Sequence, residues 1–347
     1  MEQKKISVLV IDDSALVREL LSKIIPVDGD IDVVDTAPDP YIAREKIKKH
    51  NPDVLTLDVE MPRMDGITFL RNLMRLRPMP VIMISALTEK GAAKTLEAME
   101  LGAVGYITKP SSDLGGQLEL YGKEIREKIR EAAGSNFRRA FAARGEASSQ
   151  EPPKGSINAR GRIIGIGASA GGTEAIQAVL SRMPSDSPGV VVCQHMPVLF
   201  TSMFAARLDQ STGLNVNLAK DREEILQGHV YIAPGDRHLQ VVRQGERFYC
   251  RLNDSPEVNH HKPSVDTLFL SLAEHAKDRA IGVILTGMGR DGAEGLQEMH
   301  RRGAVTLAQD EATSLVWGMP GAAVKLNAVD VVVPLEGIPE VLVKQLV

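Results

Sequence analysis

Runs of apolar residues, each followed by a segment of helical periodicity, recur along the first third of the chain. Residues 6–11 (ISVLVI) form a continuous run rich in β-branched residues, as in a strand buried on both faces. Leucine and isoleucine then recur at helical spacing through residues 14–25, and the alternation repeats as far as a strand at 105–108. Strands that alternate with helices predict a parallel sheet covered by helices on both faces, which is an α/β fold.

A second series of this kind opens at residue 162 with RIIGIGAS and predicts another α/β domain, interrupted by an antiparallel excursion around residues 231–252. Between the two series, residues 134–160 carry Gly, Ser, Pro and Arg, and the stretch GEASSQEPPKGS within them has almost no apolar content, which is a linker composition. We therefore expect two doubly wound parallel-sheet domains, the second Rossmann-like, joined by a polar linker. The boundaries that we expect are 1–125 for the first domain, 126–158 for the linker and 159–347 for the second domain.

Composition narrows the possible partners and compartments. The net charge is -4 and aromatic residues make up 4% of the chain, so neither a basic footprint nor a base-stacking platform for nucleic acid is present. Cys193 and Cys250 are too few for a disulfide framework and are expected to be reduced, buried thiols. Asp12 and Asp13 interrupt the first apolar run, and no later stretch approaches the roughly 20 apolar residues of a membrane span. We expect a cytoplasmic protein without membrane insertion.

Polar side chains follow four strands of the first predicted sheet. Asp12 and Asp13 follow the first strand, Asp58 the third, Ser85 the fourth and Lys109 the fifth. Parallel strands bring these ends to one edge of the sheet. Clustered carboxylates suit Mg²⁺, and one of them can act as a nucleophile that forms an acyl phosphate. Each residue alone also fits an ordinary helix cap or surface loop. The interpretation as a phosphorylation site rests on their occurring together at one edge of the sheet.

Four motifs together resemble a two-component receiver domain of flavodoxin-like fold: DD at 12–13, LDVEMPRMDG at 57–66, SA at 85–86 and KP at 109–110. The resemblance implies that Asp58 is the phosphoacceptor and that a chemotaxis histidine kinase supplies the phosphoryl group. It also implies a cis bond between Lys109 and Pro110. The other implied roles are Mg²⁺ ligands at Asp12, Asp13 and Asp58, phosphoryl contacts at Ser85 and Lys109, and an aromatic switch at Tyr106.

The second domain begins with a strand followed by GASAG, which places Ser169 in the G-x-S-x-G spacing of a nucleophile elbow. The same run fits G-x-G-x-x-A through Gly165, Gly167 and Ala170, so a dinucleotide-binding loop competes with the nucleophile. That loop calls for an acidic residue at the end of the next strand to bind the ribose. The next strand ends instead in Gln194 and His195 (CQHMP), which favours the nucleophile.

His195 is the predicted general base for Ser169, because adjacent parallel strands bring their carboxyl ends together. A carboxylate that fixes the imidazole tautomer is supplied by Asp291 in LTGMGRDG, after a buried strand. Asp291 alone also fits a helix N-cap. The glycines of this turn expose backbone N–H groups suited to an oxyanion hole. The order Ser, His, Asp differs from that of ordinary α/β-hydrolases, so the scaffold is a different one.

GASAGG, QHMP, YIAPGDRH, HHKPSVD and LTGMGRDG resemble the catalytic domain of the chemotaxis protein-glutamate methylesterase (CheB) family. The resemblance implies a Ser169–His195–Asp291 triad, an oxyanion contact from the Met288 N–H, and no cofactor for the esterase step. It implies hydrolysis of glutamate methyl esters on methyl-accepting chemoreceptors and deamidation of receptor glutamines. At position 290 this chain has an arginine, where many members of the family are expected to have an acidic residue.

Three alternatives remain open at this point. His260 and His261 invite a metal site, although no Cys or Glu pattern accompanies them and a structural or substrate-loop role is favoured, as for His238. The second domain also fits a catalytically inactive adaptor controlled by the receiver. Finally, GIGASAGG fits the phosphate loop of an NAD(P)-binding regulator.

Overall fold

The computed structural model describes residues 4–85, 88–109, 117–135, 137 and 161–346. The chain divides into two compact units, Met1–Phe141 and Ala142–Val347. Pro110, and with it the predicted cis bond to Lys109, lies outside the described residues, as does most of the predicted linker. No helix in the described ranges is long and apolar enough to cross a membrane.

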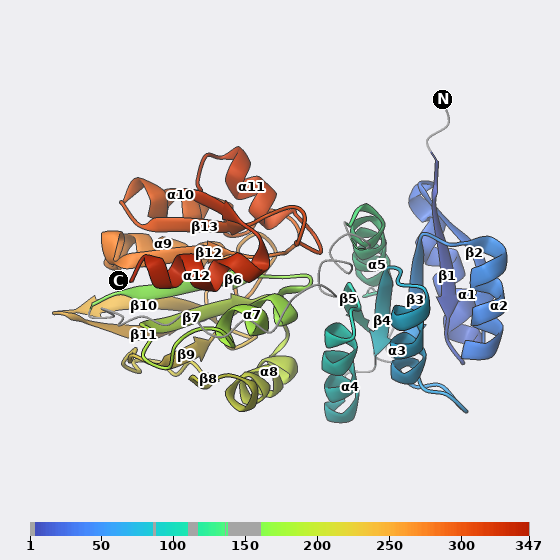
Figure 1. Cartoon of the computed structure of the whole chain (residues 1–347). Helices are drawn as coiled ribbons and strands as arrows, with labels where there is room; N and C mark the ends of the chain where they lie inside the picture. The colour runs from blue at the N-terminus through green and yellow to red at the C-terminus, as the bar shows by residue number, and fades with distance from the viewer. Residues whose placement is uncertain (1–3, 86–87, 110–116, 136, 138–160, 347) are drawn as a thin grey trace. The chain divides into compact units, whose positions relative to one another are not determined.

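The first unit is a parallel sheet of order β2-β1-β3-β4-β5, with α2 and α3 side by side on one face and α1 and α5 on the other (Figure 1). Its strands are β1 Ile6–Ile11, β2 Ile31–Ala37, β3 Val54–Asp58, β4 Val81–Ser85 and β5 Gly105–Thr108. Its helices are α1 Ala15–Ile24, η1 Ile25–Asp28, α2 Pro40–His50, α3 Gly66–Leu76, α4 Glu89–Glu100 and α5 Gln117–Gly134. The order 2-1-3-4-5 is that of the flavodoxin-like fold, as predicted.

Helix α5 extends well past residue 125, where the sequence analysis ended the first domain. Its apolar face buries Ile125 and Ile129 completely. On the polar side, the Arg126 guanidinium lies 2.9 Å from Asp28, and that of Arg130 lies 2.7 Å from Asp30. These charged residues therefore pair with the turn after α1, and the whole helix is part of the first unit.

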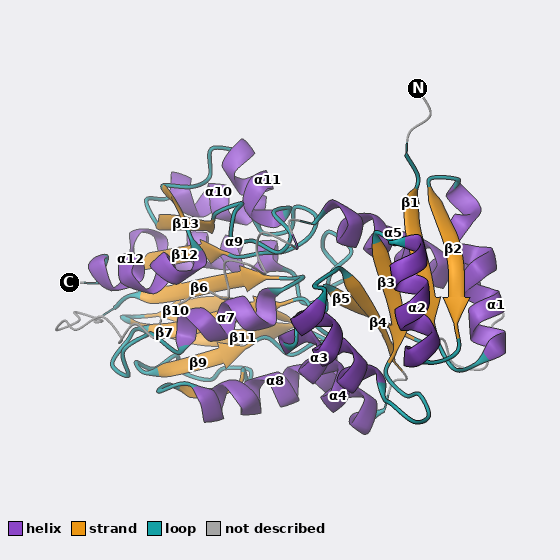
Figure 2. Ribbon diagram, turned by 45° about the vertical axis from the view of Figure 1, so that its right-hand side comes forward, coloured by secondary structure: helices purple, strands orange, loops and turns teal. Residues whose placement is uncertain are grey.

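The second unit is built on a seven-stranded sheet of order β14-β13-β12-β6-β7-β9-β8, in which every pairing is parallel (Figure 2). Its strands are β6 Ile163–Ala168, β7 Gly189–Gln194, β8 Asn215–Leu218, β9 His229–Ile232, β12 Ala280–Ile284, β13 Val305–Gln309 and β14 Val331–Val333. Its helices are α7 Gly172–Leu180, α8 Val198–Ser211, α9 Val265–His275, η2 Lys277–Arg279, α10 Ala293–Arg301, α11 Met319–Lys325, η3 Leu335–Gly337 and α12 Ile338–Lys344.

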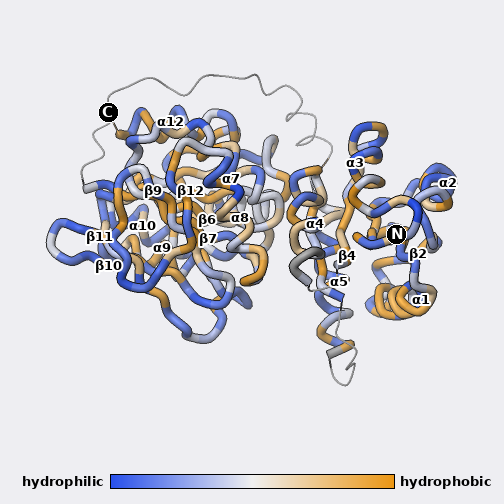
Figure 3. The backbone as a smooth tube through the Cα atoms, turned by 90° about the horizontal axis from the view of Figure 1, so that it is seen from below, coloured by the Kyte–Doolittle hydropathy of each residue, from blue (hydrophilic) through white to orange (hydrophobic). Residues whose placement is uncertain are grey.

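The predicted antiparallel excursion is confirmed as a separate hairpin, β10 His238–Gln244 with β11 Arg247–Asn253. Its tip is hydrophilic (Figure 3). Tyr231, where the excursion was expected to begin, belongs instead to β9 of the parallel sheet. Both cysteines are buried and unpaired, as predicted.

The order of the large sheet creates a crevice at its centre. From β6 the chain moves outward through β7 to β9 and β8, and it returns on the other side of β6 with β12, β13 and β14. The carboxyl ends of β6 and β12 therefore meet at a topological switch point, the place where open α/β sheets bind ligands. The predicted nucleophile and the predicted carboxylate follow these two strands.

Candidate functional site

Ser169 lies in the tight turn that joins β6 to α7. The turn closes through a bond from the Gly172 N–H to the Ser169 carbonyl, at 2.8 Å. Gly171 adopts φ 73°, and a Cβ there would approach Leu315 to 2.9 Å, so the position suits only glycine. The strand, glycines and helix together hold the half-buried serine at the carboxyl end of the sheet. This is the geometry of a nucleophile elbow.

The loop after β12 packs directly against this turn. The Ser169 N–H donates to the Thr286 carbonyl at 3.0 Å, and the Thr286 hydroxyl donates to the Ala170 carbonyl at 2.9 Å. A Cβ on Gly287 would lie only 2.9 Å from the Ser169 Cβ. The absence of a side chain at Gly287 therefore lets its backbone pack directly against Ser169. Met288, the predicted oxyanion contributor, is the next residue, and Gly289 then takes φ 72°.

His195 leaves the strand beside β6 at the level of the serine turn. Ala168 and Gln194 are paired in the β6–β7 register, and the Gln194 amide donates to the Ser169 carbonyl at 2.9 Å. His195 Nε2 lies 2.8 Å from Asp291 Oδ2, with both side chains more than nine-tenths buried. Its Nδ1 is also buried and has no hydrogen-bond partner in the described part of the chain. The ring is therefore held through one nitrogen, and the other remains available to accept a proton.

Asp291 is surrounded by hydrogen-bond donors. Its carboxylate accepts from the His195 ring, the Asn259 amide, the Ser264 hydroxyl and the backbone N–H groups of Val265 and Asp266, at 2.6 to 3.2 Å. Burial alone would raise the pKa of Asp291, but the bonds from His195, Asn259 and Val265 hold that pKa far below its usual value. The carboxylate is thus kept ionised and fixed in position beside the imidazole.

A second buried carboxylate, Asp266, lies next to the first. Burial, with a further contribution from the charge of Asp291, raises the pKa of Asp266 to about 6. The Asn259 Nδ2 bridges the pair, lying 2.7 Å from Asp266 Oδ2 and 2.9 Å from Asp291 Oδ1. One amide group therefore stabilises two adjacent negative charges.

Asn259 belongs to a two-residue turn that also brings His261 to the site. Val258 and His261 exchange two backbone bonds of 2.9 and 3.1 Å, and the intervening Asn259 and His260 both take positive φ, at 54° and 64°. Such turns favour asparagine at the first position. The His261 ring stacks on that of His195 with centroids 3.7 Å apart. The sequence analysis favoured a structural or substrate-loop role for His261. It did not identify Asn259, although an asparagine before the two histidines was a possible signal of this turn.

The structure also places two other residues that the sequence analysis weighed and bears on the metal alternative for His260 and His261. His238 is buried and accepts the Ser264 N–H at 3.1 Å, so it supports the helix start that contacts Asp291. Arg290, the departure from the family pattern, is exposed and pairs with Glu294 at 3.1 Å. Among the described residues, the group of acidic, histidine or cysteine side chains placed to hold a metal ion is in the first unit and does not include His260 or His261.

The glycines that suggested a dinucleotide loop have a packing role. Gly165 and Gly167 lie within β6 itself, not in the loop after it. Cβ atoms there would lie 2.3 Å from Leu272 and 2.2 Å from Val265, both on α9. The missing side chains allow α9 to pack closely on the central strand, which disfavours the phosphate-loop interpretation.

In the first unit the predicted acidic cluster is assembled at the carboxyl ends of β1 and β3. Carboxylate oxygens of Asp12, Asp13 and Asp58 all lie within 4.8 Å of one another. Lys109 Nζ is 3.0 Å from Asp12 and 2.9 Å from Asp58. Burial, reinforced by the charge of Asp12, raises the pKa of Asp58 to about 6 despite this lysine. The cluster carries more negative charge than one ammonium group neutralises.

Ser85 and Tyr106 lie on the neighbouring strands. The Lys109 N–H donates to the Ser85 carbonyl at 2.8 Å, so the two predicted phosphoryl contacts leave adjacent strands together. Tyr106 is paired with Met83 across β4 and β5, and Lys128 Nζ lies 6.0 Å from its ring centroid. Burial raises the pKa of the Tyr106 hydroxyl, which stays protonated.

Comparison with known proteins accounts for both units. The family model described as CheB methylesterase matches residues 164–342, and that of the response regulator receiver domain matches residues 8–115. A Xanthomonas campestris pv. campestris protein named protein-glutamate methylesterase/protein-glutamine glutaminase 1 is 54% identical over 345 residues, covering 97% of this chain and 96% of its own. The chain belongs to the CheB family.

Other members are similarly close. A Chromohalobacter salexigens protein named protein-glutamate methylesterase/protein-glutamine glutaminase is 52% identical over 345 residues, covering 99% of this chain and 97% of its own. The crystal structure of the Thermotoga maritima CheB methylesterase catalytic domain superposes with a TM-score of 0.52 at 38% identity, covering 53% of this chain and 98% of that one. These findings confirm the two α/β domains and the CheB resemblance; the roles of the individual site residues stay predictions.

Proposed function

We propose that this chain is a phosphorylation-regulated protein-glutamate methylesterase that hydrolyses glutamate methyl esters on methyl-accepting chemoreceptors. Its membership of the CheB family and the names of its full-length relatives support this activity. The observation that carries the mechanism is the buried His195–Asp291 pair, 2.8 Å apart, beside the Ser169 turn at the switch point of the sheet. A buried imidazole held through one nitrogen by an ionised carboxylate is suited to act as the general base for a serine.

In the proposed acylation step, His195 Nδ1 takes the proton of Ser169 as Oγ attacks the ester carbonyl carbon. Collapse of the tetrahedral intermediate breaks the carbon–methoxy bond, and the imidazolium returns its proton to the departing oxygen, which releases methanol. Water then attacks the acyl-enzyme with His195 again as base, and the carboxylate product and free serine are formed. A glutamine substrate follows the same route with ammonia as leaving group, which accounts for the proposed deamidation.

Asp291 and Met288 stabilise the charges of these steps. Asp291 keeps the imidazole proton on Nε2 in the resting state and stabilises the imidazolium that forms transiently. The Met288 N–H lies in the glycine-rich loop that abuts Ser169, and we assign it to the developing oxyanion. One donor of this kind contributes on the order of 10²- to 10³-fold in kcat.

The receiver supplies the regulation. We assign Asp58 as phosphoacceptor, with a chemotaxis histidine kinase as phosphodonor, and Asp12, Asp13 and Asp58 as the residues that hold Mg²⁺. The donor set fits: oxygen ligands from a crowded carboxylate cluster, one of them with its pKa raised to about 6. When bound, Mg²⁺ would neutralise the negative charge of the carboxylate and phosphoryl oxygens. Ser85 and Lys109 then contact the phosphoryl group, and Tyr106 responds to it.

The decisive experiment measures methanol release from methylated chemoreceptor membranes by the full chain, with and without acetyl phosphate. We expect release that disappears in Ser169→Ala and that rises with acetyl phosphate in the wild type but not in Asp58→Asn. Release unaffected by Ser169→Ala would refute the serine mechanism. Absence of release from phosphorylated wild type would favour the adaptor alternative, in which the second domain acts by binding alone.

A further inference from the structure

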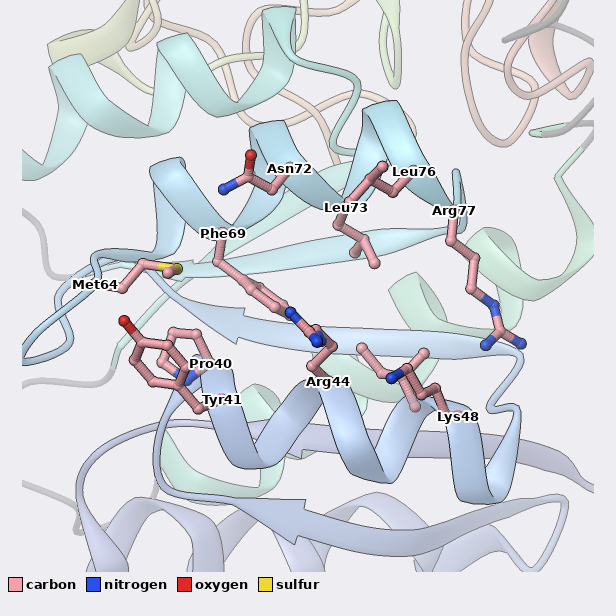
Figure 4. A pocket seen from close by; sticks show the side chains of 11 residues that line it. Pro40, Tyr41, Arg44, Lys48, Met64, Phe69, Asn72, Leu73, Leu76 and Arg77 are labelled. Carbon is pink, nitrogen blue, oxygen red and sulfur yellow. The ribbon is translucent and has the colours of Figure 1, made fainter.

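A groove of about 610 Å³ lies between helices α2 and α3 of the first unit (Figure 4). Ile47 of α2 and Phe69 and Leu73 of α3 form its floor, with 3%, 6% and 8% of their surfaces exposed. Tyr41 and Leu76 stand on its margins and are 54% and 73% exposed. The groove is therefore an apolar trough whose rim presents large hydrophobic side chains to solvent, as at protein interaction sites.

The charged residues that line the groove are all basic. They are Arg44, Lys48 and Arg77, and no aspartate or glutamate of the described chain lines it. Glu45, outside the lining, approaches Lys48 to 3.4 Å and Arg44 to 3.9 Å, but all three side chains are more than half exposed and such contacts are weak. The rim therefore keeps a net positive charge and favours an acidic partner.

The dimensions of the groove match a short helix. The lining runs from Pro40 to Lys48 along α2 and from Phe69 to Leu76 along α3, which at about 1.5 Å per residue is roughly 12 Å and 10 Å. The two helices run in the same direction, and the Arg77 guanidinium closes their far end by donating to Asn51. Side chains at i, i+4 and i+7 of a helix span the same distance and present one apolar stripe. The groove is lined only by residues of α2 and α3 and by Met64 and Arg77 beside them, so within the described chain it offers no strand edge with which an extended peptide could pair.

We propose that this groove docks an acidic amphipathic helix of about two to three turns from a partner protein. Its apolar stripe fills the trough over Phe69 and Leu73, and its carboxylates face Arg44, Lys48 and Arg77. None of the residues of the acidic cluster lines the groove, so the proposed partner contacts residues other than those of the phosphorylation site.

The test measures fluorescence anisotropy of a labelled helical peptide of about 14 residues, with leucines at i, i+4 and i+7 and glutamates elsewhere, titrated with the full chain. We expect saturable binding that weakens about tenfold in Leu76→Glu and about fivefold in Arg44→Glu. Leu16→Glu and Arg75→Glu are the matched controls, because both residues are exposed and neither lines the groove, and they should stay within about twofold. Circular dichroism establishes that each variant is folded.

A second peptide keeps the leucines and replaces every glutamate by lysine. Equal binding of the two peptides, equal losses in Arg44→Glu and Arg75→Glu, or no saturation by about 1 mM chain would overturn the proposal. Sedimentation velocity tests the other possible occupant, a second copy of this chain. Self-association that Leu76→Glu abolishes would assign the groove to that second copy and reject the acidic helix.

Discussion

Replacing Asp291 by asparagine keeps the shape of this side chain but leaves only one oxygen to receive its donors. Oδ2 accepts from His195 Nε2 at 2.8 Å and the Val265 N–H at 2.6 Å. Oδ1 accepts from the Asn259 amide, the Ser264 hydroxyl and the Asp266 N–H. In either orientation, the new NH₂ group therefore faces donors in a buried site.

The two orientations have different consequences. With NH₂ toward Asn259, Ser264 and Asp266, the lost bonds cost about 1–3 kcal/mol each, because the groups are buried. With NH₂ toward His195 and Val265, fewer donors are lost, so this orientation is favoured. Nε2 must then accept, and the imidazole proton moves to Nδ1, the nitrogen needed by Ser169. We expect kcat/KM to fall on the order of 10³- to 10⁴-fold, or about 4–5.5 kcal/mol in the barrier.

Methanol release from methylated chemoreceptor membranes, measured with acetyl phosphate present, checks this prediction. Asp266→Asn is the matched control, since Asp266 is a buried neighbour whose Oδ1 accepts the Gly295 N–H at 2.6 Å, a bond that the asparagine oxygen retains. We expect the control to lose less than about tenfold. An Asp291→Asn enzyme that keeps a tenth of wild-type activity, or a control that loses as much as the test variant, would contradict the tautomer argument.

Three further predictions concern the support of the two sites. Asn259→Gly fits φ 54° but removes the amide bond from both carboxylates, so the pKa of Asp266 should rise further and kcat/KM should fall about tenfold. Titration of the Asp266 carboxyl carbon by NMR measures this pKa, and an unchanged pKa would argue against the bridge. Gly287→Ala would place a Cβ 2.9 Å from that of Ser169 and should lower methanol release more than about 100-fold, while Gly213→Ala, with open space around it, should not. The folded pKa of Asp58 is raised to about 6, from about 3.9 in unfolded chains, so folding favours its neutral form. The receiver should therefore lose about 1.4 kcal/mol of its free energy of unfolding as pH rises from 5 to 8, relative to Asp58→Asn, and millimolar Mg²⁺ should restore this stability in calorimetry.

The sequence sufficed for features that depend on local pattern. Apolar runs and helical periodicity predicted both parallel sheets, and the residues placed at the ends of β1, β3, β6, β7 and β12 are brought together at the sheet edges, as expected of parallel strands. The expected boundary at residue 125 falls inside α5, because the partners of its charged residues, Asp28 and Asp30, lie about 100 residues earlier and no local pattern indicates them. β14, with three residues, and α11, which begins with Met-Pro-Gly, carry too little periodic signal.

The support of the triad could not be predicted for a related reason. Asn259 and His261 act through a turn whose position depends on how the segment before α9 crosses the end of β12. Nothing in the local spacing links that turn to His195, more than sixty residues earlier. The asparagine indicates a turn, but the contacts that the turn makes depend on the tertiary fold and could not be predicted from local sequence.

The central place of β12 also bears on how the enzyme is synthesised. His195 and Asp291 are separated by 96 residues, and β12 inserts between β6 and β13. A nascent chain that has formed β6, β7, β9 and β8 therefore has its proposed nucleophile and base but exposes one edge of β6, an unpaired template for other strands. Arrival of β12 covers that edge and delivers Asp291 in the same event. The proposed triad is therefore complete only once β6 is paired on both sides.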